Sequence, residues 1–140
     1  MTTGALTAAQ IRRIRNRLNR VPFARLLGME LVAAEVGSAT LQISIRAEFK
    51  QIHGVMHGGA IASLIDTATA FAIVTILPDE EKFSTVDLMV NYLLPLKAGT
   101  ATARARVVRN GRRLITVSAE LLDNAGNLAA TALSTYIKLS

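Results

Sequence analysis

The chain has 140 residues, of which 51% are hydrophobic and 19% are charged, so it fits one domain with a real core and is too apolar for a disordered chain. Its formal net charge is +6, but six arginines and no acid lie in residues 1–28, which leaves the rest neutral and excludes a nucleic-acid surface over the whole domain. The absence of cysteine excludes a disulfide framework and thiolate chemistry, and we expect a reducing, cytoplasmic compartment.

The N-terminal segment predicts a basic helix. Thr7 and Gln10 have the spacing of a capping box, and Pro22 ends the helix. Between these two signals, the apolar residues Ile11, Ile14 and Leu18 recur at helical spacing, and arginines lie on the other face of the helix. We expect residues 1–21 to form this helix and residues 22–140 to form a single domain. The first twenty residues resemble a transit peptide in composition, but they lack the apolar core of a secretory signal, and we favour a surface helix.

The remaining pattern predicts an α+β domain. Gly37-Ser38 joins the first two strands, Asn110-Gly111 has the composition of a two-residue hairpin loop, and residues 123–127 form a turn. The expected strands are 29–36, 38–46, 83–94, 100–108, 113–122 and 128–138. Their short connections make the late strands antiparallel.

One long apolar helix is expected at 58–77. It is long enough to span a membrane, but a central Asp66 is costly there and no second span follows, so we interpret it as buried in protein. Because it is apolar on nearly all sides, either the sheet curls around it or a second subunit covers what is left.

Asp66 is the single carboxylate of this segment. A carboxylate in apolar surroundings is expensive unless it is paired, and stability alone would favour leucine or alanine. Either Asp66 lies on an exposed stripe of the helix beside Ser63 and Thr67, or the residue serves a function.

Two glycines, Gly58 and Gly59, follow His57 where this helix begins. Bare backbone allows another group to approach closely, and the free N–H groups favour developing negative charge. An ordinary loop-to-helix junction is the alternative. Residues 58 and 66 are roughly 12 Å apart along the helix axis, at ~1.5 Å per residue. If both serve one reaction, Asp66 must come from an antiparallel helix of a second subunit.

The stretch GVMHGGAIASLIDTATAFA resembles the signature of the PaaI-like hotdog thioesterases. The segments PFARLLGMEL, VDLMVNYLLPLKAG, RNGRRL and AATALSTYIKL extend the similarity over residues 22–138. The resemblance implies a hotdog fold, a long central helix wrapped by a curved antiparallel sheet of about six strands. It also implies a homodimer or homotetramer with its active site between subunits. The implied activity is that of an acyl-CoA thioesterase for a small aromatic or a short or medium aliphatic acyl group, with no cofactor and no metal.

The same resemblance implies roles for residues near the helix start. Asp66 matches the catalytic carboxylate, as nucleophile or as general base on water. Gly58 matches the residue whose amide polarises the thioester carbonyl, with Gly59 beside it. His57 would support that loop or the sulfur side, and Gln51 would lie near the thioester or the water.

Further contacts are expected from two later segments. Thr85, or Ser84 if the loop differs by one residue, matches a hydroxyl near the carboxylate. Leu94 stands where many members have arginine, so no phosphate contact is expected there. Arg112 and Arg113 lie in an arginine-rich hairpin, and arginine suits the phosphates of coenzyme A, although a solvated hairpin explains them equally well.

Other chemistries have less support. His53 and His57 lack an HExxH context for a metal, Ser63 lacks G-x-S-x-G, and no Walker or G-x-G-x-x-G loop is present. Two rival functions stay open. One is a non-catalytic acyl-CoA-binding protein and the other is a hotdog hydratase, which would pair a histidine with an acid in a different motif.

Overall fold

The computed structural model describes residues 4–139; the ends of the expected segments 1–21 and 22–140, at residues 1–3 and 140, lie outside the described residues. The helices are α1 (Ala8–Asn19), α2 (Pro22–Leu27) and α3 (Gly58–Val74), with a 3-10 turn η1 (Ala47–Phe49). The strands are β1 (Glu30–Glu35), β2 (Ser38–Ser44), β3 (Lys82–Tyr92), β4 (Thr100–Asn110), β5 (Leu114–Leu122) and β6 (Leu128–Leu139). The α+β composition predicted from the sequence is confirmed.

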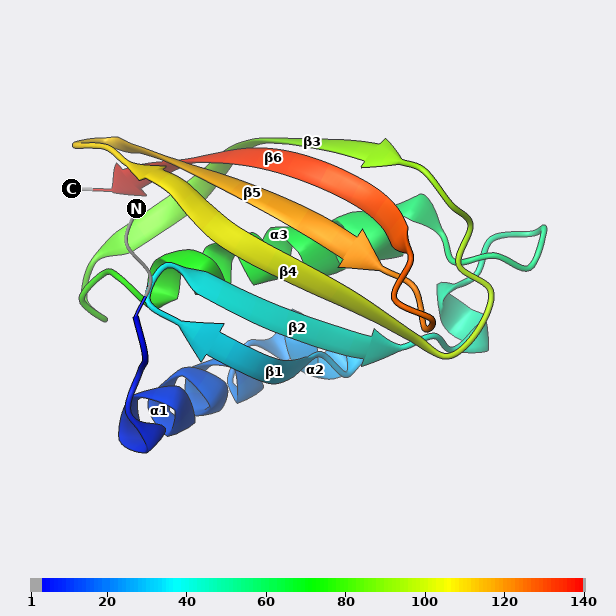
Figure 1. Ribbon diagram of the computed structural model, residues 1–140, viewed down its shortest axis with the longest axis horizontal. Coiled ribbons are helices and arrows are strands. Elements are labelled where there is room, and N and C mark those ends of the chain that lie inside the picture. The colour runs from blue at the N-terminus through cyan, green and yellow to red at the C-terminus, as the bar shows by residue number, and fades with distance from the viewer. Residues whose placement is uncertain (1–3, 140) are drawn as a thin grey trace.

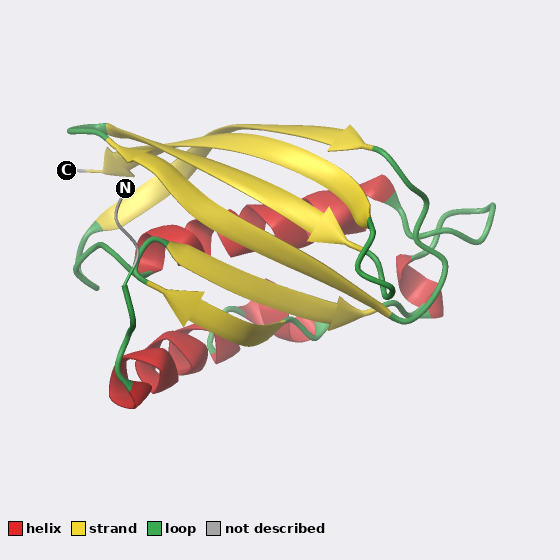
Figure 2. Cartoon of the chain, viewed as in Figure 1, coloured by secondary structure: helices red, strands yellow, loops and turns green. Residues whose placement is uncertain are grey.

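The six strands form one antiparallel sheet in the order β1-β2-β4-β5-β6-β3. The sheet curves around α3, which lies against its inner face, while α1 and α2 lie beside the β1 edge (Figure 1 and Figure 2). The expectation that the sheet curls around the apolar helix is therefore confirmed. β1 and β3 form the two edges, and no described residue pairs with the outer edge of β3.

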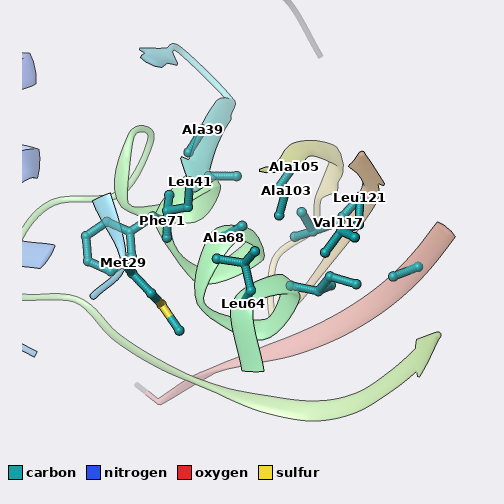
Figure 3. Close-up of a cluster of buried hydrophobic side chains, with 14 of the residues drawn as sticks. Met29, Ala39, Leu41, Leu64, Ala68, Phe71, Ala103, Ala105, Val117 and Leu121 are labelled. Carbon is teal, nitrogen blue, oxygen red and sulfur yellow. The ribbon is translucent and has the colours of Figure 1, made fainter. Parts of the chain in front are cut away.

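The core is the contact between α3 and the inner face of the sheet. Leu64, Ala68 and Phe71 of the helix lie close to small and branched side chains of the central strands (Figure 3). Leu64 and Ala68 are both 0% exposed. Burying a leucine side chain contributes about 1.5–3 kcal/mol, and alanines on the strands let the helix approach closely. The facing strand residues include Leu41, Ala103, Ala105, Val117 and Leu121.

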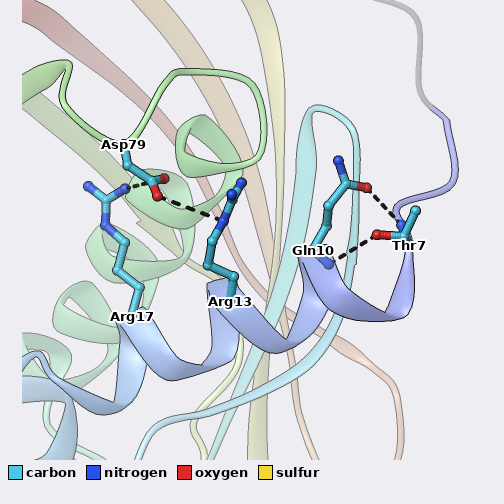
Figure 4. Close-up of polar contacts among 5 residues, drawn as sticks. All are labelled: Thr7, Gln10, Arg13, Arg17 and Asp79. Atoms are coloured by element: carbon cyan, nitrogen blue, oxygen red, sulfur yellow. Dashed lines mark hydrogen bonds and ion pairs between the residues drawn. The ribbon is translucent and has the colours of Figure 1, made fainter.

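Helix α1 has the capping box that its sequence predicted. Thr7 Oγ1 accepts from the Gln10 N–H at 3.1 Å, and Gln10 Oε1 accepts from the Thr7 N–H at 2.8 Å (Figure 4). Buried Ile14 and Leu18 attach α1 to the core. Two arginines of its exposed face, Arg13 and Arg17, lie 3.7 and 3.5 Å from the Asp79 carboxylate. Such exposed ion pairs contribute about 0–1 kcal/mol each.

The strand bounds differ from the predicted ranges by one or two residues at one end or both, and two differences, in α3 and in the hairpin after β4, have a cause that the structure shows. Helix α3 ends at Val74 rather than at residue 77, because the Thr75 hydroxyl donates to the Ala72 carbonyl at 2.6 Å and accepts from the Gly37 N–H at 2.7 Å. This pair of bonds fixes the helix end to the turn between β1 and β2.

None of the helices within residues 4–139 is both long and apolar enough to cross a membrane.

The second difference concerns the hairpin between β4 and β5. Asn110 still pairs with Ile115, and the Gly111 N–H donates to the Leu114 carbonyl at 2.9 Å. The loop is therefore Arg112-Arg113, and the prediction that Asn110-Gly111 forms it was wrong. Gly111 does not take the positive φ that such a loop requires.

Candidate active site

The amino end of α3 presents backbone donors. His57 is the N-cap residue, and its Nδ1 accepts a hydrogen bond from the Gly59 N–H at 2.8 Å. The backbone donor one residue earlier, the N–H of Gly58, has no acceptor among the described residues. It stands at the positive end of the helix dipole, where a partial negative charge is stabilised.

Gly58 is packed against an aromatic ring. The Tyr92 hydroxyl, at the end of β3, donates to the Gly58 carbonyl at 2.8 Å. A Cβ atom on Gly58 would lie 3.3 Å from the Tyr92 ring, and one on Gly59 would lie 3.0 Å from the His57 ring. Only glycine fits these two positions without displacing a neighbour, so the glycine pair keeps the helix end bare.

Asp66 lies two turns further along α3 and is half-buried. Thr85 on β3 donates to Asp66 Oδ1 at 3.0 Å, and the Tyr136 hydroxyl on β6 lies 3.3 Å from the same oxygen. No donor among residues 4–139 bonds Oδ2. The carboxylate is thus held through one oxygen. Asp66 is half-buried like Ser63 and Thr67, so it does lie on the helix face that the sequence suggested, where it is bonded through Oδ1.

The two candidate hydroxyls of β3 lie on opposite faces. Thr85 pairs with Tyr136 and Ser84 pairs with Ile137, so alternation directs Thr85 toward α3 and Ser84 toward the outer face. Ser84 has no contact with Asp66. Gln51 is not brought to Asp66 either, because its side chain turns back and accepts from the His53 N–H within its own loop.

The arginine hairpin lies at the other end of β3 from Gly58. The register places Leu114 beside Ile137 and Lys82 beside Leu139, whereas Gly58 is bonded to Tyr92. The eleven residues of β3 span roughly 35 Å. Arg112 and Arg113, both exposed, therefore lie far from Gly58 of the same chain.

An apolar cavity of about 320 Å³ adjoins Gly58. Its lining includes Val55, Met56, Ile61, Tyr92 and Leu96. Gly58 is itself part of the lining, so a group held in the cavity would lie beside the amino end of α3.

Both tyrosines of the chain contact the candidate site, and neither was predicted from the sequence as a site residue. Tyr92 bonds Gly58 and Tyr136 bonds Asp66. The available signal was their position: a tyrosine on the inner face of a strand needs a polar partner for its hydroxyl. Burial raises the pKa of Tyr136 to about 12, so its phenol remains a hydrogen-bond donor at neutral pH.

A free helix-end amide and an anchored carboxylate are the elements of a hydrolytic site, one for the developing oxyanion and one to attack or to activate water. Within residues 4–139, no group of three or more histidine, aspartate and glutamate side chains is placed to hold a metal ion.

Comparison with known proteins defines the family. The model of the thioesterase superfamily matches residues 53–130, which include Gly58, Asp66 and Thr85. The medium/long-chain acyl-CoA thioesterase YigI of Escherichia coli K12 is 31% identical over 132 residues, 84% of this chain and 85% of YigI. The chain belongs to the thioesterase superfamily and is a thioester hydrolase.

Solved structures agree with this assignment. A thioesterase family protein from Silicibacter pomeroyi superposes with a TM-score of 0.86 at 26% identity, over 93% of this chain and 98% of that one. The E. coli PaaI protein has a TM-score of 0.87 at 22% identity, over 97% of both chains, and shows the shared fold. The predicted hotdog fold is confirmed.

Proposed function

We propose that the protein is an acyl-CoA thioesterase in which the Gly58 amide polarises the thioester carbonyl and Asp66 supplies the attacking or proton-accepting group. The observation that carries the proposal is the presence on one helix of an unbonded terminal N–H and a carboxylate anchored by a single oxygen. The name of YigI, a medium/long-chain acyl-CoA thioesterase, supports the substrate class.

A site that uses both groups needs two chains. Gly58 and Asp66 lie on the same straight helix, roughly 12 Å apart at ~1.5 Å per residue, whereas a reacting carbonyl needs both groups within about 3.5 Å. We therefore propose a two-fold homodimer, or a homotetramer built from it, in which each site takes Gly58 from one subunit and Asp66 from the other.

The free edge of β3 supports this assembly. A long unpaired edge strand is a template for pairing with a second chain, and Val86 and Met89 on it are 55% and 58% exposed. Antiparallel pairing of two β3 edges about Leu88–Met89 would set Thr85, and with it Asp66, opposite Tyr92 of the partner subunit, and with it the partner's Gly58. The same pairing would bring the arginine hairpin toward the partner's helix end.

Two routes are consistent with the geometry. As nucleophile, Asp66 Oδ2 would attack the thioester carbon, the C–S bond would break with release of the coenzyme A thiolate, and water would hydrolyse the acyl anhydride. As general base, Oδ2 would take a proton from water while the water oxygen attacks the same carbon, and the C–S bond would then break to release the carboxylic acid and the coenzyme A thiolate, to which the proton is returned. Neither route uses a cofactor or a metal.

The remaining residues would hold the substrate. The apolar cavity beside Gly58 suits a small aromatic or a short or medium aliphatic acyl group. His57 would maintain the donor geometry of the helix end, and Gln51 would lie near the thioester or the water. Arg112 or Arg113 would meet the coenzyme A phosphates. Because the chain has no cysteine, a reducing cytoplasm is the proposed location.

Release of free thiol from a panel of acyl-CoA esters tests the function. We expect turnover by the wild-type chain and a loss of about 10²–10⁴-fold in kcat for Asp66→Ala, the usual range for a group in general acid–base catalysis. Glu120→Gln is the control, because Glu120 is an exposed carboxylate on β5 that pairs with Arg104 and Thr131, away from the β3 edge. Near wild-type hydrolysis by Asp66→Ala would contradict the mechanism. Acyl-CoA binding without any turnover would favour the non-catalytic rival, and hydration of an enoyl-CoA would favour the hydratase.

A further inference from the structure

The hydroxyl of Tyr136 lies at the centre of a buried group of oxygen atoms. The residue is 2% exposed. Its phenol oxygen lies 2.8 Å from Thr69 Oγ1, 2.8 Å from the Asp66 backbone carbonyl and 3.3 Å from Asp66 Oδ1. Phe83 packs edge-on against the ring, with centroids 5.6 Å apart. The ring is thus held on one side by β3 and its hydroxyl is directed at α3.

Thr69 and Tyr136 share two hydroxyl hydrogens between them. Thr69 Oγ1 lies 2.8 Å from the Tyr136 oxygen, so one hydrogen must lie between them, and Thr69 can supply it with the phenol oxygen as acceptor. The Tyr136 hydrogen is then available to Asp66 Oδ1, and an ionised carboxylate is the stronger acceptor of the two within reach. Burial keeps the pKa of Tyr136 at about 12, so the phenol keeps this hydrogen over the range in which an esterase is assayed.

We propose that Tyr136 is a positioning residue for the Asp66 carboxylate: with Thr85 it fixes Oδ1 and leaves Oδ2 as the reacting atom. The inference rests on the proposed function. The two donors come from different strands, Thr85 from β3 and Tyr136 from β6, so together they restrict rotation of the carboxylate. A reacting atom held in this way spends more of its time in the attacking geometry.

Among the described residues of the inner face of the sheet, Tyr136 is the titratable side chain that contacts Asp66. On β6, Lys138 shares that face, but its Nζ bonds the Gly111 carbonyl at 2.9 Å. On β3, alternation places Lys82 and Asp87 on the outer face. His57, the nearest titratable group of α3 itself, is at the helix start. A change at Tyr136 therefore acts on Asp66 without displacing another charge.

We expect Tyr136→Phe to remove the hydroxyl and to keep the fold. The phenylalanine ring preserves the edge-on contact with Phe83, and Thr69 can then donate to the Asp66 carbonyl, so no buried polar group loses its last partner. Ser134→Ala is the matched control. It removes another buried hydroxyl from the inner face of β6, one that bonds the Asp87 carbonyl at 2.9 Å and does not contact Asp66.

The test compares kcat, KM and the pH profile of kcat for wild type, Tyr136→Phe and Ser134→Ala with one turned-over acyl-CoA. For Tyr136→Phe we expect kcat to fall about tenfold with KM unchanged, as for loss of one bond to a charged group. The acid limb of its profile should move to higher pH, because the ionised carboxylate loses a donor. Ser134→Ala should match wild type.

Each failure has its own signature. If Asp66→Ala retains activity, the proposed function itself is wrong. If Asp66→Ala is inactive while Tyr136→Phe keeps the wild-type kcat and pH profile, only the role of Tyr136 is overturned. A fall in kcat with an unmoved acid limb, or an equal fall in Ser134→Ala, would also overturn it, since a general loosening of the core would produce that result.

Discussion

Thr85 on β3 donates a hydrogen bond to Asp66 Oδ1 on α3 at 3.0 Å, although the two residues are 19 positions apart. The bond joins the edge strand of the sheet to the middle of the central helix. Thr85 is exposed in the single chain, whereas Asp66 is half-buried. The anchored carboxylate therefore lies at the free edge of β3, beside the surface at which we propose the second subunit pairs.

Thr85→Ala removes that donor, and Ser84→Ala is its neighbour on the opposite face of the strand. We expect kcat to fall about tenfold in Thr85→Ala, the usual effect of losing one hydrogen bond to a charged group, and to stay at the wild-type level in Ser84→Ala. Steady-state hydrolysis of one acyl-CoA by both variants measures this. The reverse order of effects would show that the hydroxyl that matters is Ser84.

Gly58→Ala tests the close approach at the helix end. The new methyl would lie 3.3 Å from the Tyr92 ring, so either the ring or the helix end must shift, and we expect kcat to fall by at least ~10-fold. In a Tyr92→Ala background there is room for the methyl. We therefore expect Gly58→Ala to lower kcat by a smaller factor in that background than in the wild-type chain. An equal factor in both backgrounds would mean that the ring is not the obstacle.

The raised pKa of Tyr136 predicts that the folded chain loses stability at high pH. Its pKa rises from 10.0 to about 12 in the folded chain, chiefly through burial, so the unfolded chain releases the proton at a lower pH than the folded one. The stabilising contribution is complete below pH 10.0 and is lost between pH 10.0 and about 12. It amounts to on the order of 3 kcal/mol, at about 1.36 kcal/mol for each pH unit between the two pKa values.

Urea unfolding of wild type and Tyr136→Phe at pH 9 and pH 11.5 measures this contribution. The wild-type chain should lose more stability between the two conditions than the variant, which has no phenol at that position. Equal losses would mean that the phenol titrates alike in the folded and unfolded chains.

His57 caps α3 through Nδ1 at 2.8 Å from the Gly59 N–H. Loss of an N-cap acceptor typically costs about 1 kcal/mol, and asparagine is among the best replacements. We therefore expect His57→Ala to unfold more readily than His57→Asn in urea at pH 7, with wild type close to the asparagine variant. If both variants were equally stable, the ring would not be acting as a cap.

The architecture was predictable because its signals are local and periodic. The capping box of Thr7 and Gln10 and the unbroken apolar face of α3 each follow from a few adjacent residues. The end of α3 was misplaced because Thr75 is fixed by Gly37, 38 positions away. The hairpin loop was misplaced because Asn110 still pairs with Ile115 and the Gly111 N–H bonds the Leu114 carbonyl.

The candidate site was predictable only in part. Asp66, Gly58 and His57 lie within one segment whose composition is unusual, and the structure links Thr85 to Asp66. Tyr92 and Tyr136 were missed because strand alternation makes them look like ordinary core residues. Their contacts with α3 span 34 and 70 positions, and no short-range pattern carries that information.

Subunit complementation is the most direct test of a site shared by two chains. Co-expression of Asp66→Ala with Gly58→Val should produce mixed dimers in which one site has both Gly58 and Asp66 intact and the other has neither. With random pairing, half of the dimers are mixed, and each mixed dimer has one functional site out of two. We therefore expect about a quarter of wild-type activity, although each parent is inactive by itself. Mixed dimers, isolated with two different affinity tags, that stay as inactive as the parents would contradict a site built from Gly58 of one subunit and Asp66 of the other.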